Sequence, residues 1–222
     1  VKVELDEIKA LLPTDIIRIE FHDNPGLRYR NAEVVLDYIV RRPETGGNFS
    51  VDMSQGVNAL WGEHRVSGKI NHKKSEFGAS YRIGPRDFYG MSRDNEEIFH
   101  LADGTVLHRK EIGDPSHASM FMHNLNLNYS VQDPEKYLFN ATFRYWNNHQ
   151  PHWDYRGILS NQDNPDDYVD MVDLNSSDNQ VPALDLYYQR NLKNDQTLVF
   201  NVVGTYNRTS SHRFYQESRG EE

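Results

Sequence analysis

Seven segments of the chain alternate apolar and polar residues with a period of two, as the two faces of a β-strand require. In the clearest segment, Phe139 and Phe143 alternate with Asn140 and Thr142. The predicted strands are residues 49–57, 65–73, 77–83, 119–129, 137–146, 183–190 and 197–206. Such alternation indicates a half-buried antiparallel sheet, so we expect a mainly β fold.

The lengths of the connections separate two architectures that fit this sheet, a soluble β-sandwich and an up-and-down outer-membrane barrel. Three expected connections are short and two are long: residues 74–76, 130–136 and 191–196 against residues 84–118 and 147–182. In an up-and-down sheet alternate connections lie at the same end, so all the short ones share one end and both long ones share the other. The connection 58–64, of modest length, is an exception on the long-loop side. Outer-membrane barrels have this arrangement, with short periplasmic turns and long external loops.

Aromatic residues at both ends of one segment also favour the barrel. Tyr137 and Tyr145 bracket the apolar face of their predicted strand. Eight residues of extended chain span ~26 Å at ~3.3 Å per residue. This length is close to the ~25 Å apolar band between the two aromatic girdles of a membrane barrel.

The composition excludes several classes of function. The net charge is −9, and no basic stripe of the kind that binds nucleic acid is present. Without cysteine the chain has no disulfide and no cysteine-ligated metal. No apolar run approaches the ~20 residues of a membrane helix. The chain begins at Val1 without a methionine, so we expect a fragment of a longer protein whose targeting signal lies outside it.

The first 43 residues have a different pattern and predict a small α/β unit. Apolar residues in 4–12 recur with helical spacing, and acidic residues stand in the first turn, where the helix dipole favours them. Pro13 ends this helix, because the residue before a proline avoids the helical region. A short apolar strand from Ile16 to Phe21 and a second apolar run from Val34 to Val40 follow.

The order of pieces from Pro13 to Arg42 resembles the end of the plug domain of TonB-dependent outer-membrane receptors. The matching pieces are the Ile-x-x-Ile-Glu run from Ile16 to Glu20, then Pro25, then Arg28-Tyr29, then the apolar strand from Val34 to Val40. The resemblance implies the C-terminal part of a plug in residues 1–43. Residues 44–222 would then be about seven strands of an incomplete antiparallel, up-and-down outer-membrane barrel.

The resemblance also implies a function, a location and partners. Such receptors lie in the outer membrane of Gram-negative bacteria and import a nutrient, for instance a siderophore, a glycan or a peptide. An inner-membrane TonB energy-coupling complex drives them, and a surface-exposed nutrient-binding lipoprotein is a further expected partner beside outer-membrane lipid. Seven strands do not close a 22-stranded barrel, so the fragment itself is not expected to transport. Glu20, Arg28 and Tyr29 would contact the barrel wall.

An acidic stretch near the C-terminal side is a further candidate site. Residues 157–189 contain no Lys, Arg or His and are rich in aspartate. We expect them to form part of a solvated external loop. Closely spaced carboxylates also suit Ca²⁺, which takes several oxygen ligands. A second hypothesis is therefore a Ca²⁺ site formed by Asp163, Asp166, Asp167 and Asp170.

Four residues at the base of the long loop 147–182 form the main candidate for ligand binding: His149, His152, Trp153 and Asp154. Imidazole and carboxylate groups are zinc ligands, but a zinc site usually adds a third, distant ligand on a rigid element. We therefore favour stacking and hydrogen bonding to a sugar or a chelate, and expect no metal here. No phosphate-cradling, dinucleotide or serine-hydrolase motif occurs, so we expect neither a cofactor nor an enzyme.

The alternative to the receptor is a soluble, secreted β-rich module that binds a ligand such as a glycan. An enzyme built on the His149, His152 and Asp154 cluster is a third hypothesis. The receptor hypothesis predicts that the coding sequence begins with a signal peptide and continues with many more alternating strands of ~10 residues.

Overall fold

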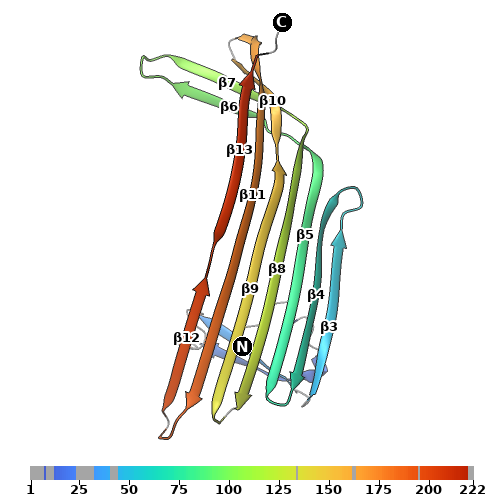
Figure 1. Cartoon of the computed structure of the whole chain (residues 1–222), viewed down its shortest axis with the longest axis vertical. Coiled ribbons are helices and arrows are strands. Elements are labelled where there is room, and N and C mark those ends of the chain that lie inside the picture. Colours follow the sequence, from blue (N-terminus) through green and yellow to red (C-terminus); the bar gives the residue numbers. More distant parts are fainter. Residues whose placement is uncertain are drawn as a thin grey trace.

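The computed structural model describes residues 8, 13–23, 33–40, 45–133, 135–161, 164–194 and 196–219. They form two antiparallel sheets, a small one of two strands and a main one of eleven. The fold is mainly β, as the sequence predicts, and the main sheet curls into a half-barrel (Figure 1). No helix among the described residues is long and apolar enough to cross a membrane.

The small sheet pairs β1 (Ile16–Asp23) with β2 (Val34–Val40), and a short 3₁₀ helix, η1 (Pro13–Asp15), precedes it. The strands of the main sheet are β3 (Thr45–Gln55), β4 (Leu60–His72), β5 (Ser75–Met91), β6 (Asn95–His100), β7 (Val106–Asp114), β8 (Ser116–Asp133), β9 (Tyr137–Trp153), β10 (Tyr155–Asn161), β11 (Asn164–Asn191), β12 (Thr197–Thr205) and β13 (Arg208–Ser218). The helix expected over residues 4–12 lies outside the described residues, apart from Ile8.

Three pairs of consecutive strands behave as single long strands with one interruption each. Pro115 separates β7 from β8, Asp154 separates β9 from β10, and residues 206–207 separate β12 from β13. β8 pairs with β9 and β7 pairs with β10, and β12 and β13 both pair with β11. The long strands therefore follow one another across the sheet in sequence order, which is the predicted up-and-down arrangement.

The short connections lie together at the lower end of the sheet in Figure 1, as predicted. They join β4 to β5, β8 to β9, and β11 to β12. Lys73 and Asn194 have positive φ angles of 52° and 63°, a conformation that tight turns use. The opposite end carries the turn between β3 and β4 and the β6–β7 hairpin (Figure 1).

The prediction of two long loops, at residues 84–118 and 147–182, is wrong. β5 continues to Met91, and the β6–β7 hairpin occupies much of the first range. β9 continues to Trp153, and β10 and β11 occupy most of the second range. Polar residues stand on both faces here, so the apolar–polar contrast that marks a half-buried strand disappears while the backbone ladder continues.

One face of the lower part of the main sheet carries a continuous band of apolar side chains. Directly paired residues lie on the same face of a sheet, so the register places these side chains together. We call them the apolar band: Phe49, Val51, Val66, Ile70, Phe77, Ala79, Tyr81, Leu125, Leu127, Tyr129, Phe139, Ala141, Phe143, Tyr145, Leu184, Leu186, Tyr188, Phe200 and Val202. It crosses all the long strands from β3 to β12.

The opposite face at the same level is polar and rich in asparagine and serine. Ser50 and Ser67 lie opposite each other on β3 and β4, with their hydroxyl oxygens 2.7 Å apart. Thr142 on β9 donates a hydrogen bond of 2.9 Å to Asn128 Oδ1 on β8. The alternation read from the sequence therefore separates one apolar and one polar face.

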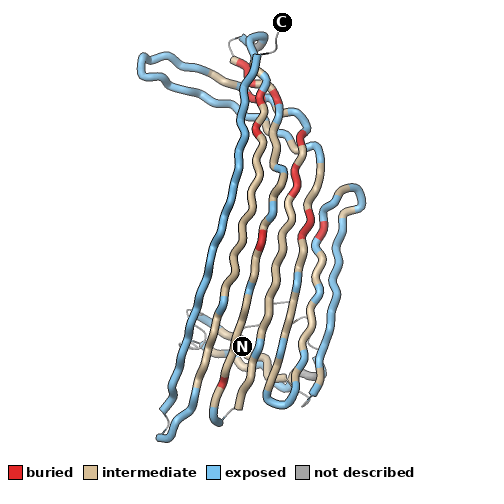
Figure 2. Tube along the Cα trace, viewed as in Figure 1, coloured by how far each residue is buried: buried red, intermediate tan, exposed pale blue. Residues whose placement is uncertain are grey.

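Little of the chain is buried, because the main sheet is a single layer along most of its length. Among the described residues, only Ala118, Leu138, Leu159 and Met171 are buried hydrophobic residues. Many apolar-band side chains are exposed, including Phe49 at 72% on β3 and Val202 at 60% on β12. Figure 2 shows that the buried residues are few and scattered, mostly toward the upper end.

The segment between β5 and β6 packs closely against β7 near the upper end of the sheet. It comes so close to Gly113 on β7 that a Cβ there would lie 2.5 Å from the carbonyl oxygen of Arg93. The Gly113 N–H donates a 3.0 Å hydrogen bond to Asp94 Oδ1. Met171 of β11 is almost fully buried in this upper region. The glycine is required here by close approach of backbone to backbone.

Candidate functional site

Two strand interruptions lie opposite each other and create an irregular point in the main sheet. Below this point Ala118 of β8 faces Trp153 of β9, and above it Asp114 of β7 faces Arg156 of β10. Pro115 interrupts the ladder because proline has no N–H to donate. The buried Ser116 hydroxyl compensates: it donates to the Asp114 carbonyl at 2.9 Å and accepts from the Arg156 N–H at 3.1 Å.

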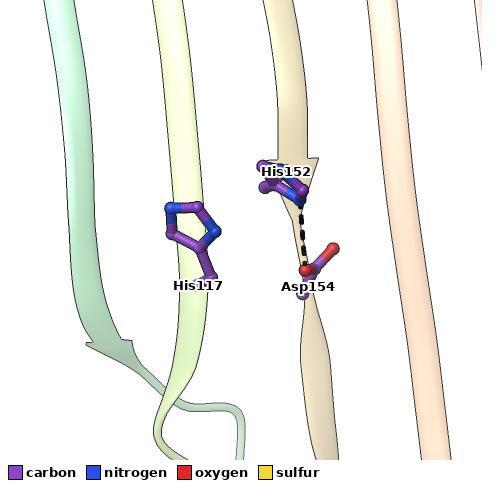
Figure 3. A group of neighbouring side chains, drawn as sticks. All are labelled: His117, His152 and Asp154. Carbon is purple, nitrogen blue, oxygen red and sulfur yellow. Dashed lines mark ion pairs between the residues drawn. The ribbon is translucent and has the colours of Figure 1, made fainter.

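Two histidines and one aspartate gather at this point, from the two facing strands (Figure 3). His117 belongs to β8, His152 to β9, and Asp154 is the residue between β9 and β10. One potential ligand atom from each of the three lies within 4.8 Å of those of the other two. The Asp154 N–H donates a 3.0 Å hydrogen bond to the His117 carbonyl, which fixes the two backbones relative to each other.

His117 is held on both sides by groups from neighbouring strands. Its Nε2 lies 2.8 Å from Asp87 Oδ1 on β5. Its ring stacks on Tyr89 of β5 at 4.3 Å between centroids and on His152 at 4.5 Å. The His117 side chain is therefore mostly buried, whereas half of the His152 side chain is exposed.

A buried hydroxyl lies under this cluster. Ser119 of β8 is paired with Asp87 on one side and with His152 on the other, so it shares their face. It is only 2% exposed, and its Oγ has no hydrogen-bond partner among the described residues. A buried hydroxyl without a partner is unfavourable and calls for a further polar group at this position.

The four loop-base candidates from the sequence are placed differently from what we expected. His149, His152 and Trp153 lie within β9, and only Asp154 lies outside a strand. His149 pairs with Asp178 of β11 through Nδ1 at 3.1 Å. The Trp153 Nε1–H donates to the Tyr155 hydroxyl at 3.0 Å. Only His152 and Asp154 belong to the cluster. The prediction that they lie at the base of a loop is wrong, because β9 and β10 continue the strand pairing on both sides of Asp154.

The sequence did not indicate His117 or Asp87 as parts of the cluster. Asp87 lies on β5 and His117 on β8, both far in sequence from His152 and Asp154, and no local motif connects them. The available signal is the register: once β8 and β9 are paired through Ala118 and Trp153, His117 must lie at the level of the β9–β10 interruption.

The acidic residues proposed as a Ca²⁺ site are spread along a strand. Asp163 lies outside the described residues, whereas Asp166, Asp167 and Asp170 belong to β11. Successive side chains of a strand point to opposite faces, so Asp166 and Asp167 diverge. Asp167 pairs with Arg219 at 3.0 Å. Within the described part of the chain, the His117, His152 and Asp154 group is the one set of side chains arranged to hold a metal ion.

One aspartate of the acidic stretch is buried and paired, which corrects the expectation of a solvated loop. Asp173 of β11 is 2% exposed and accepts two hydrogen bonds from Arg213 of β13, at 2.8 and 3.0 Å. Asn175 donates a third at 3.0 Å, and Arg93 lies at 3.6 Å. Burial by itself raises the pKa of Asp173, but these donors together hold the pKa below its ordinary value.

Arg93 extends this group to a second buried carboxylate. It binds Glu111 of β7 at 2.8 Å and stacks over the Tyr155 ring, 4.2 Å from its centroid. Both acids are therefore paired inside the upper region. We call Arg93, Glu111, Asp173 and Arg213 the charged cluster, and we interpret it as a structural group.

The contacts expected between the plug residues Glu20, Arg28 and Tyr29 and the barrel wall stay predictions. Arg28 and Tyr29 lie outside the described residues. Glu20 is on β1, where it pairs with Arg18 at 2.6 Å and lies 3.6 Å from His22. These partners belong to its own strand.

Comparison of the chain with protein-family models, with curated proteins and with solved structures found no match.

Proposed function

We propose that this chain is a wall segment of an outer-membrane barrel that belongs to a TonB-dependent nutrient receptor. The observation that carries the proposal is the apolar band. It continues across all the long strands on one face, and no second layer of described residues covers it. A contiguous apolar surface of this size on a monomer marks contact with a membrane or with another protein.

The two faces of the lower sheet suit a barrel wall. In an outer-membrane barrel, side chains alternate between lipid and a polar interior along every strand. The apolar band would face lipid, and the asparagine- and serine-rich face would line the interior. Tyr81 and Tyr145 lie in one row near the upper border of the band, since both are paired with Leu125. Aromatic side chains favour such a border because their apolar rings meet lipid and their hydroxyls meet water.

The position of the short turns supports the same orientation. All three lie at one end of the sheet, as periplasmic turns do in bacterial barrels. The β6–β7 hairpin lies at the opposite end (Figure 1). We infer that this upper end would face the outside of the cell, where a nutrient or a nutrient-binding lipoprotein would approach.

The N-terminal 43 residues would be the end of the plug. The receptor proposal assigns β1 and β2 to that domain, with Glu20, Arg28 and Tyr29 in contact with the barrel wall and residues 44–222 forming the wall itself. The described strands leave the barrel open, so transport would need the full-length protein, its TonB energy-coupling complex and the outer membrane. The segment has no catalytic role in this proposal.

The coding sequence on both sides of the chain tests the proposal. We expect a signal peptide upstream and many further alternating strands of ~10 residues downstream. A reading frame that stops near Glu222 would contradict the receptor and favour a secreted glycan-binding module. Because it concerns residues outside the chain, this test is independent of the site discussed next.

A further inference from the structure

We propose that His117, His152 and Asp154 bind one divalent first-row transition metal ion, of which Zn²⁺ is the representative. Asp87 is the positioning residue that orients His117. The site lies on the upper sheet, above the apolar band, at the opposed interruptions of the β7–β8 and β9–β10 strands. It does not depend on the receptor proposal.

The first argument is the spacing of the ligand atoms. Two ligands bound to one ion at the 2.0–2.2 Å typical of Zn–N and Zn–O lie roughly 3–3.5 Å apart. His152 Nδ1 and Asp154 Oδ2 are already 3.5 Å apart. The ligand atom of His117 lies within 4.8 Å of both, and binding requires the two stacked imidazoles to rotate until their nitrogens converge on the ion.

The second argument is the hydrogen bond on the far side of His117. Metal-binding histidines nearly always donate their other ring N–H to a carboxylate or a carbonyl. Asp87 accepts from Nε2 at 2.8 Å, which assigns the proton to Nε2 and leaves Nδ1 with its lone pair. Figure 3 shows the second ring nitrogen on the side that faces His152 and Asp154. The aspartate thus supplies the outer partner that a metal ligand requires.

The third argument is that the backbone holds the ligands before any ion binds. The Asp154 N–H to His117 carbonyl hydrogen bond ties the two ligand-bearing strands together. The Tyr89 ring packs against the outer face of the His117 ring. The buried Ser119 Oγ, which has no described partner, adds a polar atom on the same face. A site on two paired strands needs little reorganisation of the backbone to bind.

The ligand set indicates the class of ion. Two imidazoles and one carboxylate suit Zn²⁺, Cu²⁺, Ni²⁺ or Fe²⁺, whereas Ca²⁺ and Mg²⁺ prefer oxygen ligands alone. Three protein ligands leave at least one coordination position open. The half-exposed His152 places that open position within reach of water or of a small chelating ligand.

Zinc titration of the 222-residue chain in detergent micelles tests the site, with isothermal calorimetry for Zn²⁺ and visible absorption for Co²⁺. We expect one equivalent to bind. His152→Ala and Asp154→Asn should each weaken the affinity at least about tenfold. Asp87→Asn, which touches no metal, should weaken it about 10- to 100-fold, the range for outer partners of metal ligands.

His149→Ala is the matched control. It removes a histidine from β9, the strand that also carries His152, but His149 pairs with Asp178 and lies outside the proposed site. It should leave the affinity unchanged within about twofold. Far-UV circular dichroism of every variant checks that the strands persist, and the exposed His152 makes His152→Ala the variant safest for folding. The proposal is overturned if the unmodified chain binds no Zn²⁺, or if His149→Ala loses as much affinity as His152→Ala does.

Discussion

The lower and upper parts of the main sheet belong to one continuous hydrogen-bonded sheet, but they differ in the contacts that their side chains make. In the lower part the apolar band is exposed, and described residues provide no layer against it. In the upper part, the β5–β6 segment packs closely against Gly113, and the charged cluster joins β7, β11 and β13. The upper part therefore buries and pairs its own groups.

The difference indicates which surroundings each part needs. An uncovered apolar face is stable only against lipid, detergent or another apolar surface. In the upper part the buried acids are paired with arginines, although apolar side chains such as Ile98 and Phe214 are exposed there too. The boundary between them lies above the row of Tyr81 and Tyr145, so one chain would span two media. Each of the four predictions below tests this contrast, beginning with the largest effect.

Arginine placed on the two faces of β9 should separate the faces most strongly. Ala141→Arg introduces a charge into the middle of the apolar band, whereas Thr142→Arg introduces the same charge on the polar face, opposite Asp185. Arginine at the lipid-facing midplane of a membrane barrel costs about 2–4 kcal/mol. We expect Ala141→Arg to reduce co-flotation of the chain with phosphatidylcholine vesicles strongly and Thr142→Arg to reduce it little. Equal flotation of the two variants would contradict lipid contact by the band.

Gly113→Ala tests the close packing of the β5–β6 segment against β7 in the upper part. The new methyl group would lie 2.5 Å from the Arg93 carbonyl oxygen and 2.6 Å from the Arg93 nitrogen, so the β5–β6 segment must move. Overpacking of this kind costs about 1–3 kcal/mol. We expect a lower free energy of unfolding, measured by urea titration in detergent micelles with tryptophan fluorescence as the signal.

Gly204→Ala is the control for that measurement. Gly204 lies on β12, at the level of the apolar band, and nothing lies within 4 Å of the position of its Cβ. Alanine should be accepted there without loss of stability. A loss as large as that of Gly113→Ala would mean that glycine is needed for its backbone alone, and that the β5–β6 segment adds nothing.

Much of the fold is predictable from the sequence where one face of a strand is apolar. The residues of β9 from Tyr137 to Tyr145 and those of β12 alternate clearly, and their strands are confirmed. Prediction failed for residues 147–182, where β11 carries Asp170, Asp173 and Asp178 within a polar stretch. Polar side chains on both faces leave no period to detect, although the backbone hydrogen bonds continue.

The candidate site could be predicted only in part, for a related reason. His152 and Asp154 are close in sequence, and the sequence predicts both as members of a larger set with His149 and Trp153. His117 and Asp87 reach them through two inter-strand registers, and a shift of one residue in either would turn the side chains to the other face. Register of this kind depends on the complete ladder and on the interruption at Pro115, which local sequence does not specify.

Acid should weaken the upper part through Asp173. Although burial raises its pKa, hydrogen bonds from Arg213 and Asn175 hold that pKa below the ordinary value of 3.8 in the folded chain. Folding therefore favours the ionised form, and this contribution is complete above about pH 4 and is lost as the pH falls through the folded pKa. Asp173→Asn should cost about 1.5 kcal/mol near pH 7, the low end for charged hydrogen bonds, since Arg213 is largely exposed.

The check is urea unfolding at about pH 7 and about pH 3. The difference between the unmodified chain and Asp173→Asn should shrink at the lower pH, because Asp173 is then largely protonated in the unfolded chain, and folding must keep the carboxylate ionised against that proton. A constant difference would show that the charge of Asp173 is not what stabilises the cluster.

Lys74→Gln should have the smallest effect and completes the comparison of the two parts. Lys74 stands at the β4–β5 turn and binds Asp133 Oδ2 at 2.6 Å, a distance as short as any in the charged cluster. The hydrogen bond from Lys74 lowers the pKa of Asp133, yet the ammonium group is mostly in solvent, where salt screens the pair and water replaces it. We expect the unfolding curve of Lys74→Gln to coincide with that of the unmodified chain at physiological salt. A loss of stability equal to that of Asp173→Asn would mean that the lower turns also depend on ion pairs, and that burial does not explain the contrast between the two parts.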